Sequence, residues 1–528
     1  MSEIKKWVKR SNCKDFNSYV EYCTGKTTKQ FAEDQFKEYC CPQIPLIAEE
    51  LLKIKGEQGF IAGVFDYDAD GLCSAAETHL LFNKIGIKHS LTIPKRMSEG
   101  YGVSPAMVQR FENATVLFTV DNGISAFDAI SEAKNKGMTV IVIDHHNGNG
   151  ELPDADIIAD PEELSKGWSY VHYCGAGLVY KLAQHMFPED TEFLNQLSCF
   201  AGIATIADAV DVTGDNRNII EKGLENLNKR NGTKGLNALL DLIEEKAGVN
   251  PYTVESIAFK LAPVINAPGR LNDLGGEQVL RCFFASETNA MKYAKALYDI
   301  NEQRKELVKT AMENCTVQGN NISFIYDPTI SEGICGIIAG QLSSTYHKPA
   351  YVMTKGVNGL VKGSARCEEG YNVFLSLQEC AQDLAAFGGH NQAAGFSLKE
   401  NTITDFLQDL DSCTTKLSEE CTEYYDFEID PADILPLYCE QNKIAIFGEG
   451  LKLPVVKLRT TVESPKTIGS TGTTFSCLMG NTKCIGFKMA EKYHELGSPK
   501  IMTIYATLNI NWYKGRPNSQ LQIFDMEL

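Results

Sequence analysis

Short apolar runs alternate with amphipathic segments between residues 59 and 160. Short buried runs separated by helix-like segments predict a parallel sheet that helices cover on both faces. Three of the runs end in acidic or histidine residues, in the sequences GFIAGVFDYD, ATVLFTVDN and MTVIVIDHH. Because such sheets bind their ligands at the carboxyl ends of their strands, this edge is the predicted site.

The pattern changes along the rest of the chain. Residues 171–242 favour helices, and the segment 285–315 contains no Pro or Gly and carries an apolar face, which predicts one long connecting helix. A second α/β unit is predicted from about residue 321. From about residue 430, alternating runs separated by turn residues predict a small β-barrel.

Composition and charge narrow the class of protein. The net charge of −18 argues against a general polyanion binder, yet it does not exclude a local basic groove. The 17 cysteines show no CxxC spacing, which indicates reduced, mostly buried thiols rather than a zinc site. No apolar stretch approaches the roughly 18 to 20 residues of a membrane span, and the N-terminus lacks a secretory signal, so we expect a cytoplasmic protein without membrane attachment.

The sequence DYDADG places three carboxylates, Asp66, Asp68 and Asp70, directly after an apolar run. On an extended segment these side chains would project on the same side and converge. Converging carboxylates repel one another, and a hard divalent cation is their usual stabiliser. The alternative is an Asp-rich turn that caps a helix.

Further acidic sets support the metal interpretation. Asp121 ends the next apolar run, Asp144, His145 and His146 end the one after, and Asp208 lies in a helical segment. Carboxylates combined with imidazoles favour Mn²⁺ or Mg²⁺ over a structural zinc. The ligands suffice for two ions, which can polarise a phosphoryl group and activate a water molecule.

These motifs carry a family resemblance. DYDADG, VDNGIS, DHH and IADAV, in that order, resemble the four motifs of the DHH phosphoesterases. Downstream, IAFKLAPVINAPGRLND, EGICGIIAGQL, GSAR and FGGHNQAAGF resemble the bacterial RecJ nucleases, and FGGH contains the GGH signature of the DHH-associated domain. KGRPNSQLQIFDMEL resembles the end of the RecJ oligonucleotide-binding barrel. The similarity extends from about residue 55 to the C-terminus.

The resemblance implies an α/β fold and a division of the chain. It implies an N-terminal extension (1–50), a DHH catalytic domain with a parallel sheet (51–284), the connecting helix (285–315), a second, DHH-associated α/β domain (316–425) and an OB-like β-barrel (426–528). The implied activity is metal-dependent hydrolysis of single-stranded DNA, from the 5′ end towards the 3′ end, in DNA repair, recombination or replication. A single-strand-binding protein or a helicase would be the protein partner of a monomeric chain.

Residue roles follow from the same motifs. Two Mn²⁺ or Mg²⁺ ions would be coordinated by Asp68, Asp70, Asp121, His145 and Asp208. His146 joins the catalytic group, and with Asp66 and Asp144 it would orient the ligands or contact substrate. The DNA would be bound by Arg96, Arg270, Ser364, Arg366 and His390. The alternatives are surface salt bridges for the arginines and a core position for His390.

Two further features bear on DNA binding. Phe475, Trp512 and Tyr513 of the predicted barrel are candidates for stacking on bases, although most aromatic residues of a small barrel are core. Ser331 and Cys367 depart from the family pattern, which commonly has histidine and serine there, and this puts some substrate contacts in doubt.

Three competing functions remain open at the level of sequence. A DHH phosphodiesterase for short oligonucleotides or cyclic dinucleotides would usually lack the barrel. An inorganic pyrophosphatase would need neither the GGH segment nor the barrel. A non-catalytic single-strand-binding protein would have no use for an anionic cluster facing phosphate.

Overall fold

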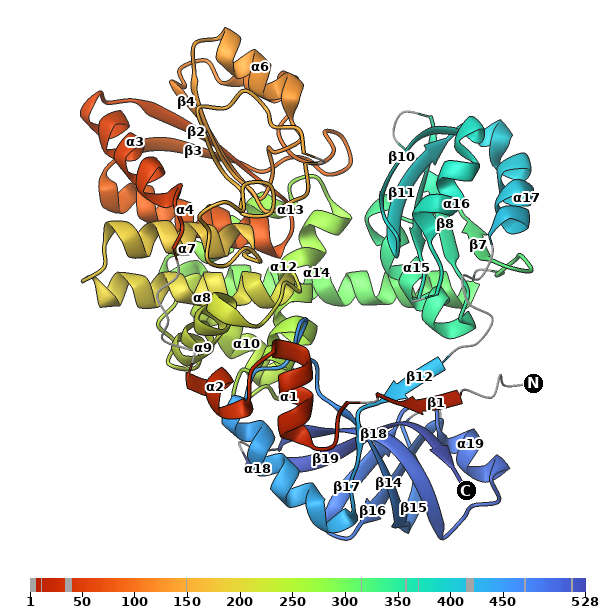
Figure 1. Cartoon of the computed structure of the whole chain (residues 1–528). Coiled ribbons are helices and arrows are strands. Elements are labelled where there is room, and N and C mark those ends of the chain that lie inside the picture. The colour runs from red at the N-terminus through yellow and green to blue at the C-terminus, as the bar shows by residue number, and fades with distance from the viewer. Residues whose placement is uncertain are drawn as a thin grey trace.

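The computed structural model of the chain describes residues 6–10, 12–33, 40–148, 150–314, 316–356, 359–368, 370–414, 422–469, 472–513 and 516–528. Its parts are two α/β domains, one long helix that joins them, and a C-terminal β domain (Figure 1). The two α/β domains lie towards opposite ends of the long helix, and the C-terminal β domain lies below it in this view (Figure 1).

The first α/β domain is built on a five-stranded, wholly parallel sheet of order β3-β2-β4-β5-β6. Its central strand β4 is buried at every position, which explains the unbroken apolar run in the sequence. The elements of this part are β2 (Phe60–Phe65), β3 (Lys88–Thr92), β4 (Val116–Val120), β5 (Thr139–Ile143), β6 (Ile157–Ala159), α3 (Ile44–Gly56), α4 (Ala69–Ile85), α5 (Pro105–Arg110) and α6 (Phe127–Asn135). The predicted parallel sheet is confirmed.

A helical part completes this domain and leads into the long helix. It comprises α7 (Gly175–Met186), α8 (Thr191–Ala207), α9 (Gly214–Asn228), α10 (Lys234–Ala247), α11 (Val254–Ser256), a π-helical turn (Ile257–Leu261), α12 (Ala262–Leu271) and α13 (Gly275–Phe283). The long helix α14 (Glu287–Asn314) follows, where the absence of Pro and Gly predicted a helix.

The second α/β domain has a mixed five-stranded sheet of order β10-β11-β9-β8-β7. Only β7 and β8 pair in parallel, and the other neighbours are antiparallel. Its elements are β7 (Ser323–Tyr326), α15 (Glu332–Tyr346), β8 (Ala350–Lys355), β9 (Val361–Arg366), α16 (Val373–Glu379), β10 (Leu384–His390), β11 (Ala393–Leu398) and α17 (Ile403–Cys413).

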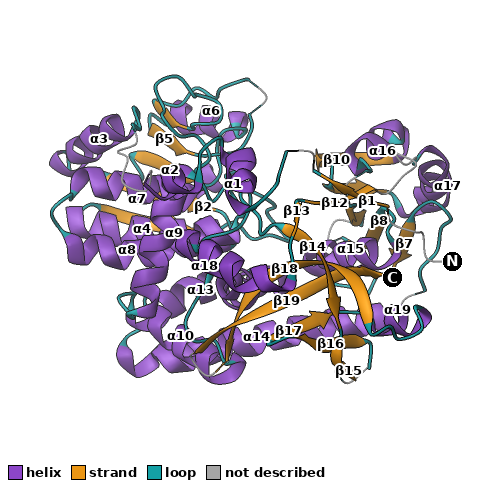
Figure 2. Ribbon diagram, turned by 60° about the horizontal axis from the view of Figure 1, so that its bottom comes forward, coloured by secondary structure: helices purple, strands orange, loops and turns teal. Residues whose placement is uncertain are grey.

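The C-terminal β domain contains a seven-stranded mixed sheet of order β13-β14-β18-β19-β17-β16-β15. Long, bent β18 and β19 run side by side in it (Figure 2). Its elements are β12 (Thr422–Tyr425), β13 (Phe427–Glu428), α18 (Ile434–Ile444), β14 (Val455–Thr461), β15 (Glu463–Ile468), β16 (Thr474–Met479), β17 (Thr482–Gly486), α19 (Ala490–Glu495), β18 (Ile501–Tyr513) and β19 (Arg516–Glu527).

The N-terminal extension packs against the C-terminal β domain. Its elements are β1 (Lys6–Lys9), α1 (Phe16–Thr24) and α2 (Thr28–Glu33), and β1 pairs in parallel with β12. The Trp7 ring stacks on Tyr505 at 4.2 Å, and its Nε1 donates to Asp525 Oδ2 at 2.7 Å. The two ends of the chain are therefore held together by side-chain contacts.

One continuous apolar core joins the first α/β domain, the N-terminal helices and the C-terminal β domain, with Phe16, Phe200 and Met502 among its members. The second α/β domain has a core of its own around Tyr351 and Phe406. The second α/β domain is thus the separately packed body at the end of α14.

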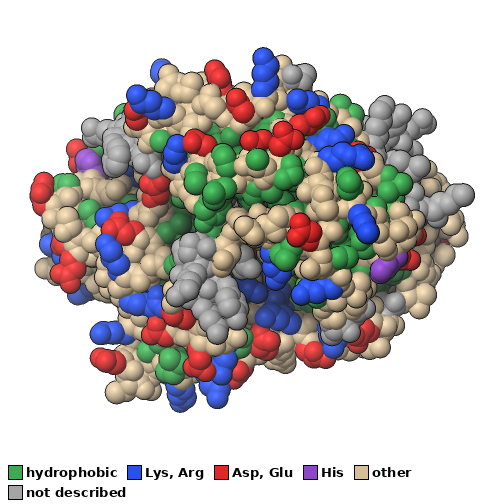
Figure 3. All heavy atoms as spheres, turned by 90° about the horizontal axis from the view of Figure 1, so that it is seen from below, with side chains coloured by type: hydrophobic (Ala, Val, Ile, Leu, Met, Phe, Trp, Pro, Cys, Tyr) green, Lys and Arg blue, Asp and Glu red, His purple; other side chains and the backbone are tan. Residues whose placement is uncertain are grey.

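The surface and the cysteines agree with the sequence. Acidic and basic side chains are interspersed on the face seen from below (Figure 3). Within the described ranges every cysteine is a free thiol. Among the described helices, none combines the length and apolar character needed to cross a bilayer.

Candidate metal centre and substrate groove

The turn between β2 and α4 carries the first three carboxylates. Asp68 is the N-cap of α4, and its Oδ1 accepts hydrogen bonds from the backbone N–H groups of Asp70 (3.0 Å) and Gly71 (3.2 Å). The expected extended segment is therefore wrong, because the helix begins at Ala69 and places Asp70 in its first turn. Gly71 is required here, since a Cβ at this position would lie 2.4 Å from the Asp66 carbonyl oxygen.

Asp70 is held by the beginning of another helix. Its Oδ2 accepts from Gly175 N at 2.7 Å and its Oδ1 from Ala176 N at 2.9 Å, both at the N-terminus of α7. Free N–H groups and the helix dipole stabilise a carboxylate at such a position. A Cβ at residue 175 would lie 2.9 Å from Asp121 Cβ and 3.1 Å from Asp70 Oδ2, so only glycine allows this approach.

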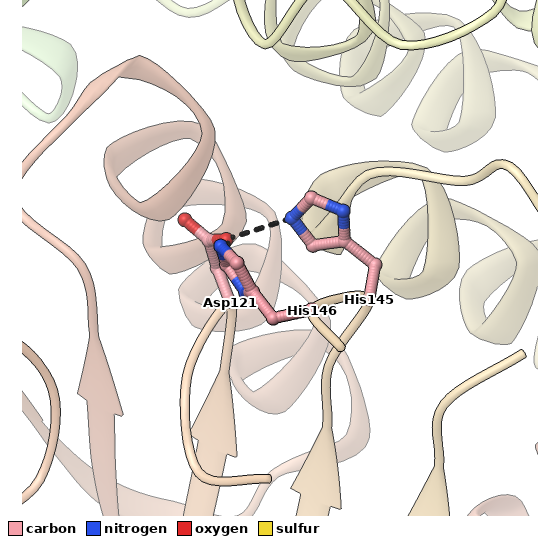
Figure 4. Close-up of side chains that lie close together, drawn as sticks. All are labelled: Asp121, His145 and His146. Atoms are coloured by element: carbon pink, nitrogen blue, oxygen red, sulfur yellow. Dashed lines mark hydrogen bonds and ion pairs between the residues drawn. The ribbon is translucent and has the colours of Figure 1, made fainter. Parts of the chain in front are cut away.

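Asp121 follows β4 and lies at the centre of the cluster. Its backbone has φ +62°, and its N–H donates to the Ile143 carbonyl at 3.0 Å. The imidazole Nε2 of His145 lies 3.1 Å from Asp121 Oδ1 (Figure 4) and 3.7 Å from both Asp70 Oδ2 and Asp208 Oδ2. Four segments that are distant in sequence thus converge on one imidazole.

Asp144 and His146 form a second, oriented pair. Asp144 Oδ1 lies 2.7 Å from His146 Nδ1, and its Oδ2 accepts from Ile124 N at 2.9 Å. Burial opposes ionisation of Asp144, but the hydrogen bond and charge of His146 outweigh it and lower the pKa of the carboxyl. Burial likewise opposes protonation of His146, yet Asp144 raises the pKa of that imidazole to about 9. Asp144 therefore serves mainly to orient its neighbour.

Three overlapping groups of side chains could each hold a divalent ion, because their ligand atoms lie within 4.8 Å of one another. The groups are Asp121 with His145 and His146, Asp70 with His145 and Asp208, and Asp66 with Asp68 and Asp121. Every predicted metal ligand belongs to at least one group, and the groups also include Asp66 and His146.

The electrostatics of the cluster fit a cation. Burial, and then repulsion between neighbouring carboxylates, raises the pKa values of Asp66, Asp121 and Asp208 well above their usual range. Asp66 Oδ1 is buried and has no hydrogen-bond partner among the described residues. Buried oxygens that repel one another and lack donors are matched by a hard divalent ion.

Arginines from both α/β domains approach the same groove. Arg96 and Ser364 line one cavity of about 280 Å³, together with Glu332, Lys362 and Phe387. The Arg96 guanidinium lies 4.8 Å from the centre of the Tyr67 ring, between the first two aspartates of the cluster. This places a cationic cavity at the boundary between the two domains.

Arg270 and Arg366 are the other two predicted arginines. Arg270 NH1 donates to the Gly333 carbonyl at 3.5 Å. Burial, and then the charge of Arg96, lowers the pKa of Arg270 to about 10, and Arg366 contributes in the same direction. Cations brought together without a bound anion are typical of a phosphate site.

Other predicted substrate residues fare differently. His390 is exposed at the end of edge strand β10 and is not among the residues that line this cavity. Phe475 is buried against Tyr493 in the core and is therefore not available for stacking on a base. The side chains of Trp512 and Tyr513 lie outside the described residues.

The two departures from the family pattern have local contacts. Ser331 Oγ lies 3.5 Å from the Arg270 carbonyl oxygen. The Cys367 backbone N–H donates to the Gln392 carbonyl at 3.1 Å, and its Sγ lies 3.3 Å from the Asn391 carbonyl oxygen. Both residues thus lie beside the predicted groove without entering the metal cluster.

Sequence reasoning missed two residues at the site. The hydroxyl of Tyr101 donates to the Asp121 carbonyl at 2.9 Å and lies 3.4 Å from His146 Nδ1. Gly175 provides the close approach to Asp70 and Asp121 described above. Neither residue stands in an acidic motif, although the glycines flanking Tyr101 indicated a loop.

Comparison with known proteins agrees with this arrangement of domains. Residues 60–207 match the DHH family N-terminal domain, residues 319–416 match the DHHA1 domain, and residues 425–525 match the RecJ OB domain. The chain therefore belongs to the DHH family of proteins. Its combination of these three domains makes it a member of the RecJ type.

Individual relatives have the same arrangement. The chain is 30% identical over 482 residues to the single-stranded-DNA-specific exonuclease RecJ of Bacillus subtilis, covering 87% of this chain and 60% of the relative. It is 27% identical over 508 residues to the Haemophilus influenzae protein of the same name, covering 87% and 86%. A crystal structure of Thermus thermophilus RecJ in complex with Mn²⁺ superposes with a TM-score of 0.81 at 21% identity, over 97% of this chain and 76% of that one. The chain thus spans less than two thirds of the length of the Bacillus relative.

Proposed function

We propose that this protein is an exonuclease that hydrolyses phosphodiester bonds of single-stranded DNA, starting at a 5′ end, with two Mn²⁺ or Mg²⁺ ions. The observation that carries the proposal is the set of three carboxylate and imidazole groups around Asp121 and His145, at the ends of parallel strands and beside a cationic groove. Relatives with the same domains are named single-stranded-DNA-specific exonucleases.

We assign the ions to Asp68, Asp70, Asp121, His145 and Asp208, with Asp66 and His146 completing the groups. Divalent ions bound there would polarise the scissile phosphoryl group and lower the pKa of an attacking water. Asp144 keeps the His146 ring in place through its 2.7 Å hydrogen bond. The two N–H groups of α7 keep Asp70 ionised and oriented.

The groove residues bind the strand in this proposal. Arg96, Arg270 and Arg366 offer planar guanidinium groups that match phosphate oxygens, and Ser364 adds a hydroxyl donor. Binding the terminal phosphate in this groove would place the first phosphodiester bond at the metal centre. His390, on its exposed hairpin, would contact the strand from the side of the second α/β domain.

Digestion of end-labelled strands tests the function. In Mn²⁺ we expect a single strand to be shortened from its 5′ end and a blunt duplex to persist. Asp121→Ala should reduce the rate by at least about 100-fold, which exceeds the usual effect of an outer-shell change. Asp128→Asn, an exposed position on α6, is the matched control. Equal digestion by Asp121→Ala would remove the proposed centre.

The same assay separates the alternatives. A phosphodiesterase for short substrates would hydrolyse dinucleotides or cyclic dinucleotides much faster than a 20-nucleotide strand. A non-catalytic binding protein would hold the 20-nucleotide strand tightly in Mn²⁺ and leave it intact.

A further inference from the structure

A cavity of about 340 Å³ lies between the long helix α14 and helix α15 of the second α/β domain. Its floor is apolar and consists of Val308 and Met312 from α14 and Ile337 from α15. Its rim carries the cations Arg304, Lys305 and Lys309. An apolar floor beneath a cationic rim matches a nucleotide, which has an apolar base face and an anionic phosphate.

The rim cations are only weakly engaged with protein groups. Lys305 Nζ lies 2.7 Å from Glu302, and Lys309 Nζ lies 4.0 Å from Glu313, in pairs whose side chains are about half or more exposed. Exposed pairs of this kind contribute little free energy and exchange readily. Arg304 Nε is buried and has no hydrogen-bond partner among the described residues. A buried donor without an acceptor is costly unless a ligand supplies one.

The cavity adjoins the groove described above. Helix α15 begins at Glu332, next to Gly333, whose carbonyl accepts from Arg270, and Ile337 of the cavity floor comes one turn later. A Cβ at Gly336 would lie 2.8 Å from the Arg366 guanidinium. The charge of Arg304 also contributes, after burial and Arg96, to the lowered pKa of Arg270. A strand leaving the groove along α15 would reach the cavity within one turn of this helix.

We propose that this cavity is a second nucleotide subsite, in which Arg304 and Lys309 bind a backbone phosphate of the strand whose end lies in the groove. The inference rests on the proposed function and extends it. The strand is then held by phosphates on both sides of α15, and long substrates gain affinity that a terminal phosphate alone does not give.

The test measures binding of a 20-nucleotide thymidine strand to the full chain carrying Asp121→Asn, which suppresses cleavage. The double variant Arg304→Gln/Lys309→Gln is compared with Lys292→Gln/Lys295→Gln, which makes the same charge change at exposed positions of the same helix. Fluorescence anisotropy is recorded across salt concentrations. The rise in unfolding temperature caused by Mn²⁺, which we expect to be equal in both variants, shows that the metal centre is intact.

We expect the cavity variant to bind the strand about 10-fold more weakly than the control variant. The slope of log K against log salt should fall by about 1.4, because each lost phosphate contact on a single strand contributes about 0.7. Equal affinities in the two variants would overturn the subsite, and so would weaker binding with an unchanged salt slope. If the unsubstituted chain fails to digest the strand, the proposed function itself is wrong.

Discussion

The carboxylates of the metal centre divide into two kinds by their hydrogen bonds. The oxygens of Asp144 accept from the backbone N–H groups of Ile124 and His145 and bond to the His146 ring. Asp66 Oδ1, in contrast, has no partner among the described residues. A carboxylate saturated by N–H donors positions its neighbours, whereas one with a bare oxygen is available to a cation.

Asp144→Asn tests the positioning role. The amide replaces one acceptor oxygen by an NH₂ group, which faces existing donors and releases the His146 ring. We expect the apparent affinity for Mn²⁺ to fall about 10- to 100-fold, as measured by titrating the hydrolysis rate with Mn²⁺. Asp128→Asn on the surface should leave the titration unchanged. An unaltered Mn²⁺ requirement in Asp144→Asn would contradict the role.

Gly175→Ala tests the close packing of α7 against the centre. The added methyl group would displace the carboxylates of Asp70 and Asp121, and we expect activity to fall at least about 10-fold. Gly177→Ala is a matched control two residues along the same helix, where a Cβ would find ordinary contacts at 3.6 Å or more. Steady-state rates at saturating Mn²⁺ distinguish the two. Similar rates for both variants would show that the approach of Gly175 is unimportant.

At the level of elements, β1 shows how a short segment depends on distant partners. It has four residues, pairs with β12 and carries Trp7 onto Tyr505 and Asp525. Nearby, Arg10 NH1 donates to Asp426 Oδ1 at 2.8 Å. The strand therefore gains its stability from side-chain contacts more than from its own length.

Trp7→Ala should lower the free energy of unfolding by about 2 kcal/mol. The loss combines an aromatic contact with a hydrogen bond to a carboxylate. Trp7→Phe keeps the ring contact and loses only the Nε1 donor, so about half of the effect should remain. Urea unfolding followed by far-ultraviolet circular dichroism measures both. Identical midpoints for wild type and Trp7→Ala would mean that β1 does not stabilise the folded chain.

At the level of the whole molecule, the C-terminal β domain is not an independent appendage. Its Phe427, Leu437 and Met502 belong to the same apolar core as the first α/β domain. Deleting it would expose that core, so loss of activity in a truncated chain would not by itself reveal a role in DNA binding. Surface substitutions such as those on α14 separate binding from stability.

The raised pKa values of the carboxylates link metal binding to the stability of the molecule. For Asp66, Asp121 and Asp208, burial and then neighbouring charges raise the pKa in the folded state above the unfolded value of about 3.9. Their contribution is therefore present below that pH and is lost as pH rises towards the folded pKa values. Above this window the metal-free protein carries repelling carboxylates.

Mn²⁺ should offset that repulsion, so we expect it to raise the unfolding temperature more at pH 8 than at pH 5, where protons compete for the ligands. Differential scanning fluorimetry with Mn²⁺ or EDTA at both pH values measures the difference. Asp121→Asn should shrink the Mn²⁺ effect at pH 8. An effect of Mn²⁺ that is equal at both pH values would contradict the linkage.

The sequence by itself determined the features that follow from local patterns. Buried runs that end in Asp66, Asp121 and Asp144 predicted that these residues meet, because parallel strands end at one edge. The lack of Pro and Gly predicted the long helix, and alternating runs predicted the β domain. The family motifs identified the remaining ligand, Asp208, and the arginines of the groove.

Only the tertiary structure decided the features that depend on packing between distant segments. Asp70 converges by entering a helix and meeting the N-terminus of α7, more than 100 residues away. Tyr101, the buried position of Phe475 and the pairing of β1 with β12 carry no local signal. Periodicity specifies which face of an element is buried, whereas the partner that buries it is selected by the packing of the whole chain.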